Sequence, residues 1–280
     1  MTAIKLTTRR IEKVWGRHKL SPWFPDAPAD GEPVGEIWYE MPGVPADAPE
    51  LLVKFLFTSE KLSIQVHPDD AAAQAAGYPR GKDEAWVVLD VEPHATIGLG
   101  LTRQSTREEL RAGALDGSIE QLVDWRPAKA GDVIYSPAGT VHALGPGLAI
   151  VEIQQNVDLT YRLYDYGRPR ELHLDEGIAV SDPEPFTRVD TPRDLGEGRT
   201  QLVDGPAFRL ERWQGVSDRF IDGPVWLVAL TGHGTIGGGA YGPGEVWYSD
   251  GGALYEPDEP TELLVAYPRI AAASGSAVTG

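Results

Sequence analysis

A chain of 280 residues, 41 % of them hydrophobic, is long enough to bury one large core or two modest ones. Its formal net charge of −17 argues against nucleic acids and anionic membranes as partners, because basic surfaces bind both. The absence of cysteine excludes disulfides and thiolate metal sites. No stretch approaches about 18 uninterrupted apolar residues, and the N-terminus lacks the apolar core of a signal peptide. We therefore expect a soluble, cytoplasmic protein.

Short strand patterns, separated by loops rich in Gly and Pro, run through the first third of the chain. The strands expected from alternating or continuous apolar residues are 11–16, 35–41, 51–57, 62–67 and 84–89. The run at 51–57 is apolar except for Lys54, as in a buried strand. Trp15, Trp38 and Trp86 are expected in the core.

The segment 62–67 differs from the others because its polar face carries potential metal ligands. Alternation places two sets of side chains on opposite faces, the apolar Leu62, Ile64 and Val66 and the polar Ser63, Gln65 and His67. Three polar groups in register favour a strand that lines a cavity. The alternative is an exposed strand face.

Helical patterns are few. A short helix is expected at 71–76, a longer helical segment at 103–123 with a break at Asp116-Gly117, and another short helix at 172–180. Before the last of these helices we expect a strand, a turn and a second strand over 131–142, and further strands at 149–154 and 158–166.

The composition changes after Ser181, where prolines and charged residues indicate a linker. We predict a mainly β protein with a first domain at 1–185, a linker at 186–199 and a second, smaller β domain at 200–280. The helical segment 103–123 is an insertion in the first domain. The second domain contains His233 and no cluster of candidate metal ligands.

Two motifs resemble those of the cupins, a superfamily of metal-binding jelly-roll barrels. The spacing Gly131-x5-Pro137-x-Gly139-x2-His142 matches their second motif, and Gln65-x-His67 with Glu84 stands where their first motif supplies ligands. The resemblance implies an N-terminal cupin barrel followed by a jelly-roll-like domain. Independently of it, inward faces of barrel strands converge. Two imidazoles, a carboxylate and an amide oxygen are plausible ligands for a divalent metal.

The longer motifs Gln65-x-His67-Pro68-Asp69 and Gly81-Lys82-x-Glu84 resemble type I mannose-6-phosphate isomerases of the short bacterial kind, over roughly residues 11–180. The C-terminal domain matches only in general character. The resemblance implies one zinc ion per chain, held by Gln65, His67, Glu84 and His142. It also implies catalytic roles for Lys82, Glu152 and Arg162. The substrate-binding residues that it implies are Ser63, Lys82, Asp158, Arg162 and Arg168, of which Ser63 and Arg168 are the candidates for the phosphate.

The implied reaction converts mannose 6-phosphate to fructose 6-phosphate through an enediol. Either Glu152 or Lys82 could carry the proton on carbon, and Lys82 would first have to lose its own proton. The alternative for Glu152 and Arg162 is a structural ion pair. An anionic substrate needs a basic entrance in this acidic protein, and the cations expected at the rim are Lys61, Arg80, Lys82, Arg162, Arg168 and Arg170. The competing functions are a metal-binding cupin acting on another substrate, and a non-catalytic sugar-binding module.

Overall fold

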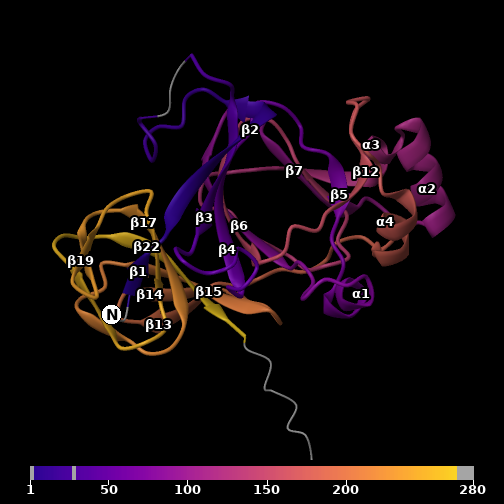
Figure 1. Cartoon of the computed structure of the whole chain (residues 1–280). Coiled ribbons are helices and arrows are strands. Elements are labelled where there is room, and N and C mark those ends of the chain that lie inside the picture. Colours follow the sequence, from indigo (N-terminus) through magenta and orange to yellow (C-terminus); the bar gives the residue numbers. More distant parts are fainter. Residues whose placement is uncertain (1–2, 27–29, 270–280) are drawn as a thin grey trace, which may run out of the picture.

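The computed structural model describes residues 3–26 and 30–269, and within them the protein is mostly β, as predicted (Figure 1). The strands of the described residues form four sheets. None of the described helices is long and apolar enough to cross a membrane.

Two of the sheets come from the N-terminal part of the chain. The β6 sheet contains, in spatial order, β2 (Thr7–Arg17), β3 (Val34–Glu40), β4 (Leu51–Phe57), β11 (Leu148–Gln155), β6 (Glu84–Val91) and β9 (Val133–Ser136). The β5 sheet contains β12 (Tyr161–Tyr164), β5 (Ile64–Val66), β10 (His142–Leu144), β7 (Thr96–Leu101) and β8 (Val123–Pro127). The strand partners recorded within these two sheets are antiparallel.

The other two sheets come mainly from the C-terminal part. The β15 sheet contains β1 (Ala3–Lys5), β20 (Val246–Ser249), β17 (Val225–Thr231), β22 (Glu262–Pro268), β15 (Phe208–Gln214), β14 (Arg199–Asp204) and β13 (Arg193–Gly196). The β18 sheet contains β16 (Arg219–Ile221), β21 (Ala253–Pro257), β18 (Gly234–Ile236) and β19 (Gly239–Tyr241).

The four sheets stack as layers, and a hydrophobic cluster lies between each sheet and the next. Leu56 and Ile150 of the β6 sheet pack with Leu99 of the β5 sheet in the interior of the N-terminal barrel. On its other face, the β6 sheet packs against the β15 sheet, which packs in turn against the β18 sheet. Strand β4 is buried along its whole length because both of its faces are covered: Phe55 and Phe57 face the β15 sheet, whereas Leu56 faces the barrel interior.

The helices cover the outer face of the β5 sheet (Figure 1). They are α1 (Asp70–Ala75), α2 (Arg107–Asp116), α3 (Ile119–Leu122) and α4 (Leu174–Val180). The predicted break at Asp116-Gly117 is confirmed: α2 begins with a capping box between Thr106 and Glu109 and ends at Gly117, whose φ of 86° suits glycine.

Two details differ from the sequence prediction. Strand β1 pairs with β20, so residues 3–5 belong to the C-terminal sheet and not to the N-terminal barrel. Residues of the expected linker form β13 and pair with β14. One core, which includes Leu6 and Val53 with Phe208 and Trp226, therefore joins the two parts of the chain.

The expected alternation in 62–67 is wrong at Leu62. Ile64 and Val66 point outward, under the helices, but Leu62 packs in the barrel interior beside the cavity. The reason is that β5 begins only at Ile64, so the preceding residues do not follow the strand period.

Candidate active site

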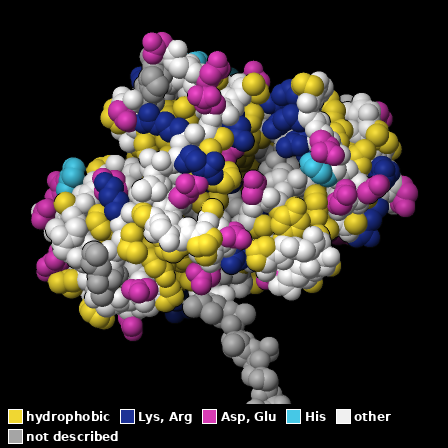
Figure 2. Space-filling view, viewed as in Figure 1, with side chains coloured by type: hydrophobic (Ala, Val, Ile, Leu, Met, Phe, Trp, Pro, Cys, Tyr) yellow, Lys and Arg dark blue, Asp and Glu magenta, His cyan; other side chains and the backbone are white. Residues whose placement is uncertain are grey.

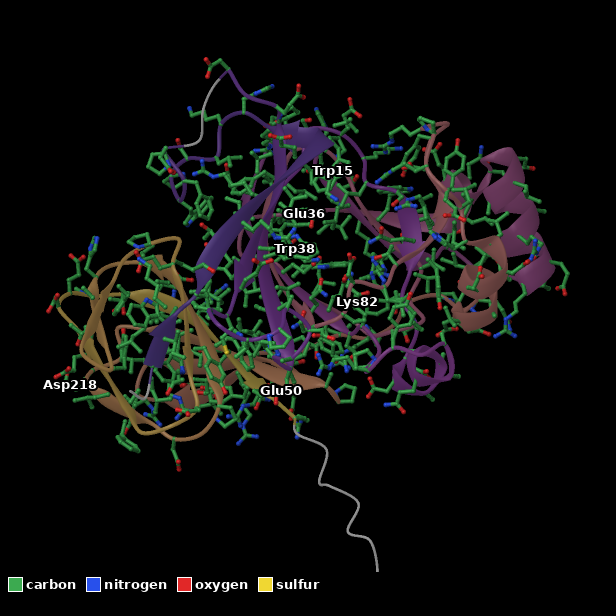
Figure 3. All side chains as sticks on the ribbon, in the orientation of Figure 1. Trp15, Glu36, Trp38, Glu50, Lys82 and Asp218 are labelled. Carbon is green, nitrogen blue, oxygen red and sulfur yellow. The ribbon has the colours of Figure 1, made fainter. Side chains whose placement is uncertain are left out.

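A polar cavity of about 320 Å³ lies between the β6 and β5 sheets. Its charged and amide-bearing lining residues are Arg9, Lys13, Glu36, Lys54, Gln65, Lys82, Glu84, Glu152, Asp158, Arg162 and Arg170. Glu36, Trp38 and Lys82 lie in this central part of the molecule (Figure 3). Lys and Arg side chains gather on both sides of a hollow in the face shown in Figure 2.

Strand register builds the cavity from two facing rows of side chains. Across the β5 sheet, Gln65 lies between Arg162 on β12 and His142 on β10. Across the β6 sheet, the row in register is Trp38, Lys54, Glu152 and Trp86. Residues that are directly opposite on neighbouring strands share a face, so each row projects as a set. Hydrogen-bonded register therefore gathers side chains from distant parts of the sequence.

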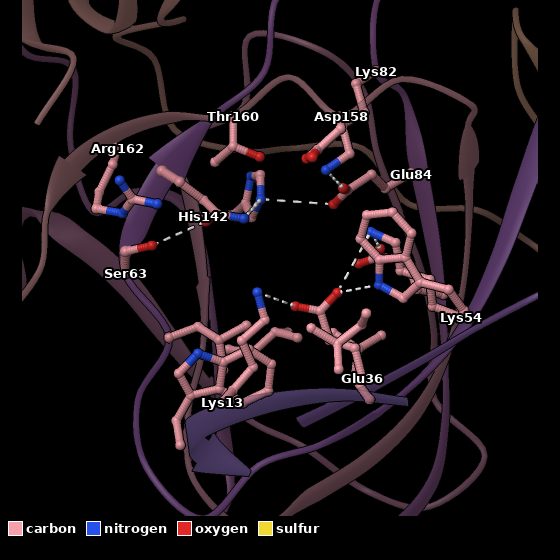
Figure 4. Close-up of a pocket in the computed structure, with 18 of the residues that line it drawn as sticks. Lys13, Glu36, Lys54, Ser63, Lys82, Glu84, His142, Asp158, Thr160 and Arg162 are labelled. Atoms are coloured by element: carbon pink, nitrogen blue, oxygen red, sulfur yellow. Dashed lines mark hydrogen bonds and ion pairs between the residues drawn. The ribbon is translucent and has the colours of Figure 1, made fainter. Parts of the chain in front are cut away.

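Glu84 and His142 lie on the wall of this cavity (Figure 4), and His67 forms a cluster with them. All three are buried, with at most 2 % exposure, and their candidate ligand atoms lie within 4.8 Å of one another. The distance from Glu84 Oε1 to His67 Nε2 is 3.2 Å, and that from Glu84 Oε2 to His142 Nε2 is 3.6 Å. Two donors about 2.0–2.1 Å from one tetrahedral zinc ion would be roughly 3.4 Å apart. The spacing of these residues thus fits a divalent metal.

Both imidazoles present Nε2 to the cluster. His67 Nδ1 lies 3.0 Å from the carbonyl of Leu159, and His142 Nδ1 lies 2.9 Å from that of Thr140. A carbonyl only accepts, so each Nδ1 is the donor and Nε2 keeps its lone pair. Burial and the nearby Lys82 lower the pKa of His67 to about 3, and burial lowers that of His142. The rings are therefore neutral at physiological pH, as metal binding requires.

The Glu84 carboxylate lacks the hydrogen bonds that a buried anion normally has. Neither of its oxygens accepts one in this structure, although Lys82 Nζ lies 2.9 Å from Oε1. Burial alone would raise the pKa of Glu84, but Lys82, His67 and His142 hold it well below its ordinary value. A buried, ionised carboxylate between two imidazole lone pairs is a suitable metal ligand.

Gln65, the fourth predicted ligand, lies beside this cluster. Its Nε2 is 3.3 Å from His142 Nε2, and its Oε1 accepts a hydrogen bond of 3.0 Å from Ser63 Oγ. Amide nitrogen and oxygen positions are assigned from their neighbours, and exchanging them would turn the oxygen to His142 and the cluster. Ser63 is buried and points its hydroxyl at this amide (Figure 4).

Lys54 is a cavity residue that sequence reasoning did not select. Its Nζ lies 3.0 Å from Glu152 Oε1 and 2.5 Å from Gln154 Oε1. Glu152 also accepts a hydrogen bond of 3.2 Å from Trp86 Nε1. Burial and the Glu84 charge raise the pKa of Glu152, although Lys54 opposes them. The signal was present in the sequence, because Lys54 is the single charged residue of the apolar run at 51–57.

Glu36 and Lys13 extend this ionic network along the cavity. Lys13 Nζ is 3.3 Å from Glu36 Oε1, and Trp38 Nε1 donates a 2.5 Å hydrogen bond to Glu36 Oε2. Trp15 and Trp86 are buried in the core, as expected. Trp38 is only partly buried, and Lys54 Nζ lies over its ring, 4.7 Å from the centroid. Trp38 is thus a wall of the cavity more than a core residue.

Arg162 does not form the structural ion pair with Glu152 that is the alternative to its catalytic role, because Lys54 pairs with Glu152. Arg162 donates a 2.7 Å hydrogen bond to the carbonyl of Glu171, its Nε is buried with no partner, and no ion pair joins it to any described carboxylate. The other cavity cations, Arg9, Lys13, Lys54, Lys82 and Arg170, each have an ion pair within the described residues. Arg162 is therefore the cation most available to an anionic ligand.

Several predicted rim cations lie elsewhere. Arg168 is not on the cavity wall, because its guanidinium donates to the carbonyls of Lys61 and Asp165. Arg170 is on the wall in its place and pairs with Asp165 through bonds of 2.5 and 2.7 Å. Arg80 binds backbone carbonyls of the 47–49 loop, and Lys61 pairs with Glu120.

Asp158 is exposed and lines the cavity near Lys82 (Figure 4).

Fold and site together define a protein with a β barrel and a buried candidate metal centre that opens into a polar cavity. No family model matches the sequence. The chain is 40 % identical over 172 residues to the mannose-6-phosphate isomerase of Streptococcus mutans, covering 59 % of this chain and 54 % of that protein. It is 34 % identical over 203 residues to a probable mannose-6-phosphate isomerase of Bacillus subtilis, covering 68 % and 64 %. The matched residues thus span less than two thirds of the length of each of these two curated relatives.

The structure resembles solved structures over nearly its whole length. The mannose 6-phosphate isomerase from Bacillus subtilis superposes with a TM-score of 0.80 at 26 % identity, covering 95 % of this chain and 100 % of that one. A phosphomannose isomerase from Salmonella typhimurium shares the fold, with a TM-score of 0.74 at 15 % identity, covering 96 % of this chain and 100 % of that one. In sequence and in fold, the chain is thus similar to mannose-6-phosphate isomerases.

Proposed function

We propose that this protein is a zinc-dependent aldose–ketose isomerase that interconverts mannose 6-phosphate and fructose 6-phosphate. The observation that carries the proposal is the buried Glu84 carboxylate, which has no hydrogen bond and lies between two neutral imidazoles at the end of a polar cavity. The names of the relatives supply the reaction. The described residues that line the cavity include six cationic side chains and four carboxylates. This local excess of positive charge suits an anionic substrate, although the chain as a whole is acidic.

His67, Glu84 and His142 would hold the zinc ion, with Gln65 as the fourth ligand once its amide oxygen faces the cluster. A bound zinc ion would supply a Lewis acid that polarises the substrate oxygens and so acidifies the neighbouring carbon. The chain's own residues would then have to move a proton between C1 and C2 and stabilise the enediol intermediate.

Lys82 and Glu152 are the two proposed carriers of that proton. Lys82 Nζ lies beside Glu84 at the proposed metal site, whereas Glu152 faces the cavity from the opposite sheet. Burial and the Glu84 charge raise the pKa of Glu152, which favours it over an ordinary carboxylate as a group that both accepts and returns a proton. Its contacts with Lys54 and Trp86 would hold the carboxylate in one orientation.

Arg162 would stabilise negative charge on the substrate. It has no carboxylate partner among the described residues, so an anionic oxygen would not have to displace one. Asp158 remains a proposed orienting residue at the cavity mouth, and Ser63 remains a proposed phosphate contact. Geometry gives Arg168 no support in that role, and Arg170 is the cation on the wall.

The proposal is tested by a coupled assay with mannose 6-phosphate before chelation, after chelation and after zinc is restored. We expect turnover to disappear with the metal and to return with zinc, and His142→Ala to reduce kcat/KM by at least about 100-fold. His233→Ala is the matched control, because His233 is an exposed histidine paired with Glu259. Turnover of mannose 6-phosphate that survives chelation would contradict the zinc requirement, and turnover of free mannose alone would contradict the substrate.

A further inference from the structure

Asp83 lies between two site residues, Lys82 and Glu84, but faces away from the cavity. Its side chain and its backbone are held by four hydrogen bonds. Tyr135 Oη donates to Oδ2, and the N–H of Ala138 donates to Oδ1 at 2.7 Å. The Asp83 N–H donates to Gln155 Oε1 at 2.9 Å, and its carbonyl accepts from the Gln155 N–H at 3.0 Å. Asp83 is 7 % exposed, so these bonds are largely protected from water.

The Asp83 carboxylate joins the segment that carries Lys82 and Glu84 to the turn at residues 137–139. That turn is connected to the two remaining residues of the cluster, His67 and His142. The Gly139 N–H donates a 2.8 Å hydrogen bond to the carbonyl of His67, and the chain leaving the turn enters β10 at His142. One side chain outside the cavity therefore links the backbones that carry all three clustered residues.

Tyr135 extends this link to the C-terminal part of the molecule. Alternation on β9 turns Tyr135 out of the barrel, opposite Ala85, into the core shared with the β15 sheet. Its ring centroid lies 5.4 Å from that of Phe208, and the Arg188 guanidinium lies 4.4 Å from the ring centroid. Gly205 packs against the same ring so closely that a Cβ there would come within 2.4 Å of Tyr135 Cζ. The C-terminal sheet thus sets where the Tyr135 hydroxyl lies.

We propose that Asp83 is a positioning residue, through which Tyr135 and the C-terminal sheet hold Lys82 and Glu84 in place at the metal centre. The inference rests on the proposed function, which makes the His67–Glu84–His142 cluster a zinc site. The C-terminal part of the chain would thus support the site, although none of its described residues lines the cavity.

The test compares two buried tyrosines that differ in what their hydroxyl groups hold. Tyr135→Phe keeps the ring and removes the bond to Asp83. Tyr39→Phe is the matched control, because Tyr39 is also buried in the shared core and its hydroxyl donates to the carbonyl of Gly244, away from the clustered residues. Zinc affinity is measured by competition with a chromogenic chelator, without sugar, and the melting temperature is recorded for each variant. Steady-state kinetics then follow for the zinc-loaded enzymes.

We expect Tyr135→Phe to weaken zinc binding about 10-fold and Asp83→Ala about 100-fold, both with a lower kcat, whereas Asp83→Asn recovers part of the loss. Tyr39→Phe should lower the melting temperature by a similar amount and leave zinc affinity unchanged. Wild-type zinc affinity and kcat in folded Tyr135→Phe would overturn the proposal, and so would an equal loss of zinc affinity in Tyr39→Phe. If Asp83→Ala does not fold, Tyr135→Phe still decides.

A second pair of variants tests the C-terminal arm. Gly205→Ala would push the Tyr135 ring, and we expect about a 10-fold loss of zinc affinity. Gly234→Ala is its control, because a Cβ there meets the Glu256 carbonyl at 2.3 Å in the β18 sheet. Equal zinc affinity in the two variants would overturn the role of the C-terminal sheet. A wild-type protein that binds zinc but leaves mannose 6-phosphate unchanged would refute the proposed function alone, since zinc affinity is measured without sugar.

Discussion

Glu36 illustrates how a buried carboxylate is kept ionised inside the cavity. Burial alone would raise its pKa, but Lys54, Lys13 and the Trp38 indole together hold it below its ordinary value of 4.5. A carboxylate whose pKa is lower in the folded state than in the unfolded chain stabilises the fold above the unfolded pKa, and this contribution is lost as pH falls through the folded pKa. Its charge is therefore part of what keeps the cavity folded at neutral pH.

The prediction for Glu36 concerns the pH dependence of stability. Glu36→Gln keeps an acceptor for Trp38 but removes the charge facing Lys13 and Lys54. We expect the variant to be less stable by about 2 kcal/mol at pH 7, a deficit that shrinks as pH falls below 4.5. Urea unfolding of both proteins across this pH range measures the difference. A deficit that is constant with pH, or grows in acid, would contradict the assigned pKa direction.

At the scale of elements, the pairing of β4 with β11 sets Lys54 directly opposite Glu152. This register places two charges in contact where both are at most 6 % exposed, and the neighbouring strand β3 adds Trp38 in the same row. Removing one member of a buried ion pair leaves the other charge without compensation, which costs more than removing both.

Lys54→Met should therefore destabilise the protein by about 3–5 kcal/mol, and Glu152→Gln by a similar amount. We expect the double variant to be clearly more stable than the sum of the two losses predicts, because no charge of the pair then remains unpaired. Denaturant unfolding of all four proteins of this cycle gives the coupling energy. Additive losses would show that the cross-strand pair is not a unit.

At the scale of the whole molecule, the core between the β6 and β15 sheets makes the two parts of the chain interdependent. Leu6, which follows β1, is 4 % exposed and packs in this core with residues from both parts. Figure 1 shows the N-terminal strand crossing from the C-terminal sheet into the barrel. A core that spans both parts favours unfolding as one cooperative unit.

We expect Leu6→Ala to lower the free energy of unfolding by about 2–5 kcal/mol through the cavity it leaves. Because both parts share this core, tryptophan fluorescence and zinc release should report the same transition midpoint in the wild type and in the variant. Zinc release at a clearly lower denaturant concentration than the fluorescence change would mean that the parts unfold separately.

The local sequence was sufficient to predict the mainly β fold and the break at Asp116-Gly117, because strand period and short turns determine both. His67, Glu84 and His142 meet only in the folded chain, and they were predicted because their motifs resemble those of a known family. The pairing of Lys54 with Glu152 could not be predicted in this way, because the two residues are 98 positions apart and meet only through strand register.

Tertiary structure alone decided which cations face the cavity. Arg168 and Arg170 are equivalent in sequence terms, but Asp165 and the Lys61 carbonyl determine their directions, and only Arg170 reaches the wall. The same holds for Asp83, whose neighbours in sequence face the cavity while its own side chain reaches Tyr135. Spacing along a strand determines which face a residue presents, whereas the packing of one sheet on another determines what that face meets.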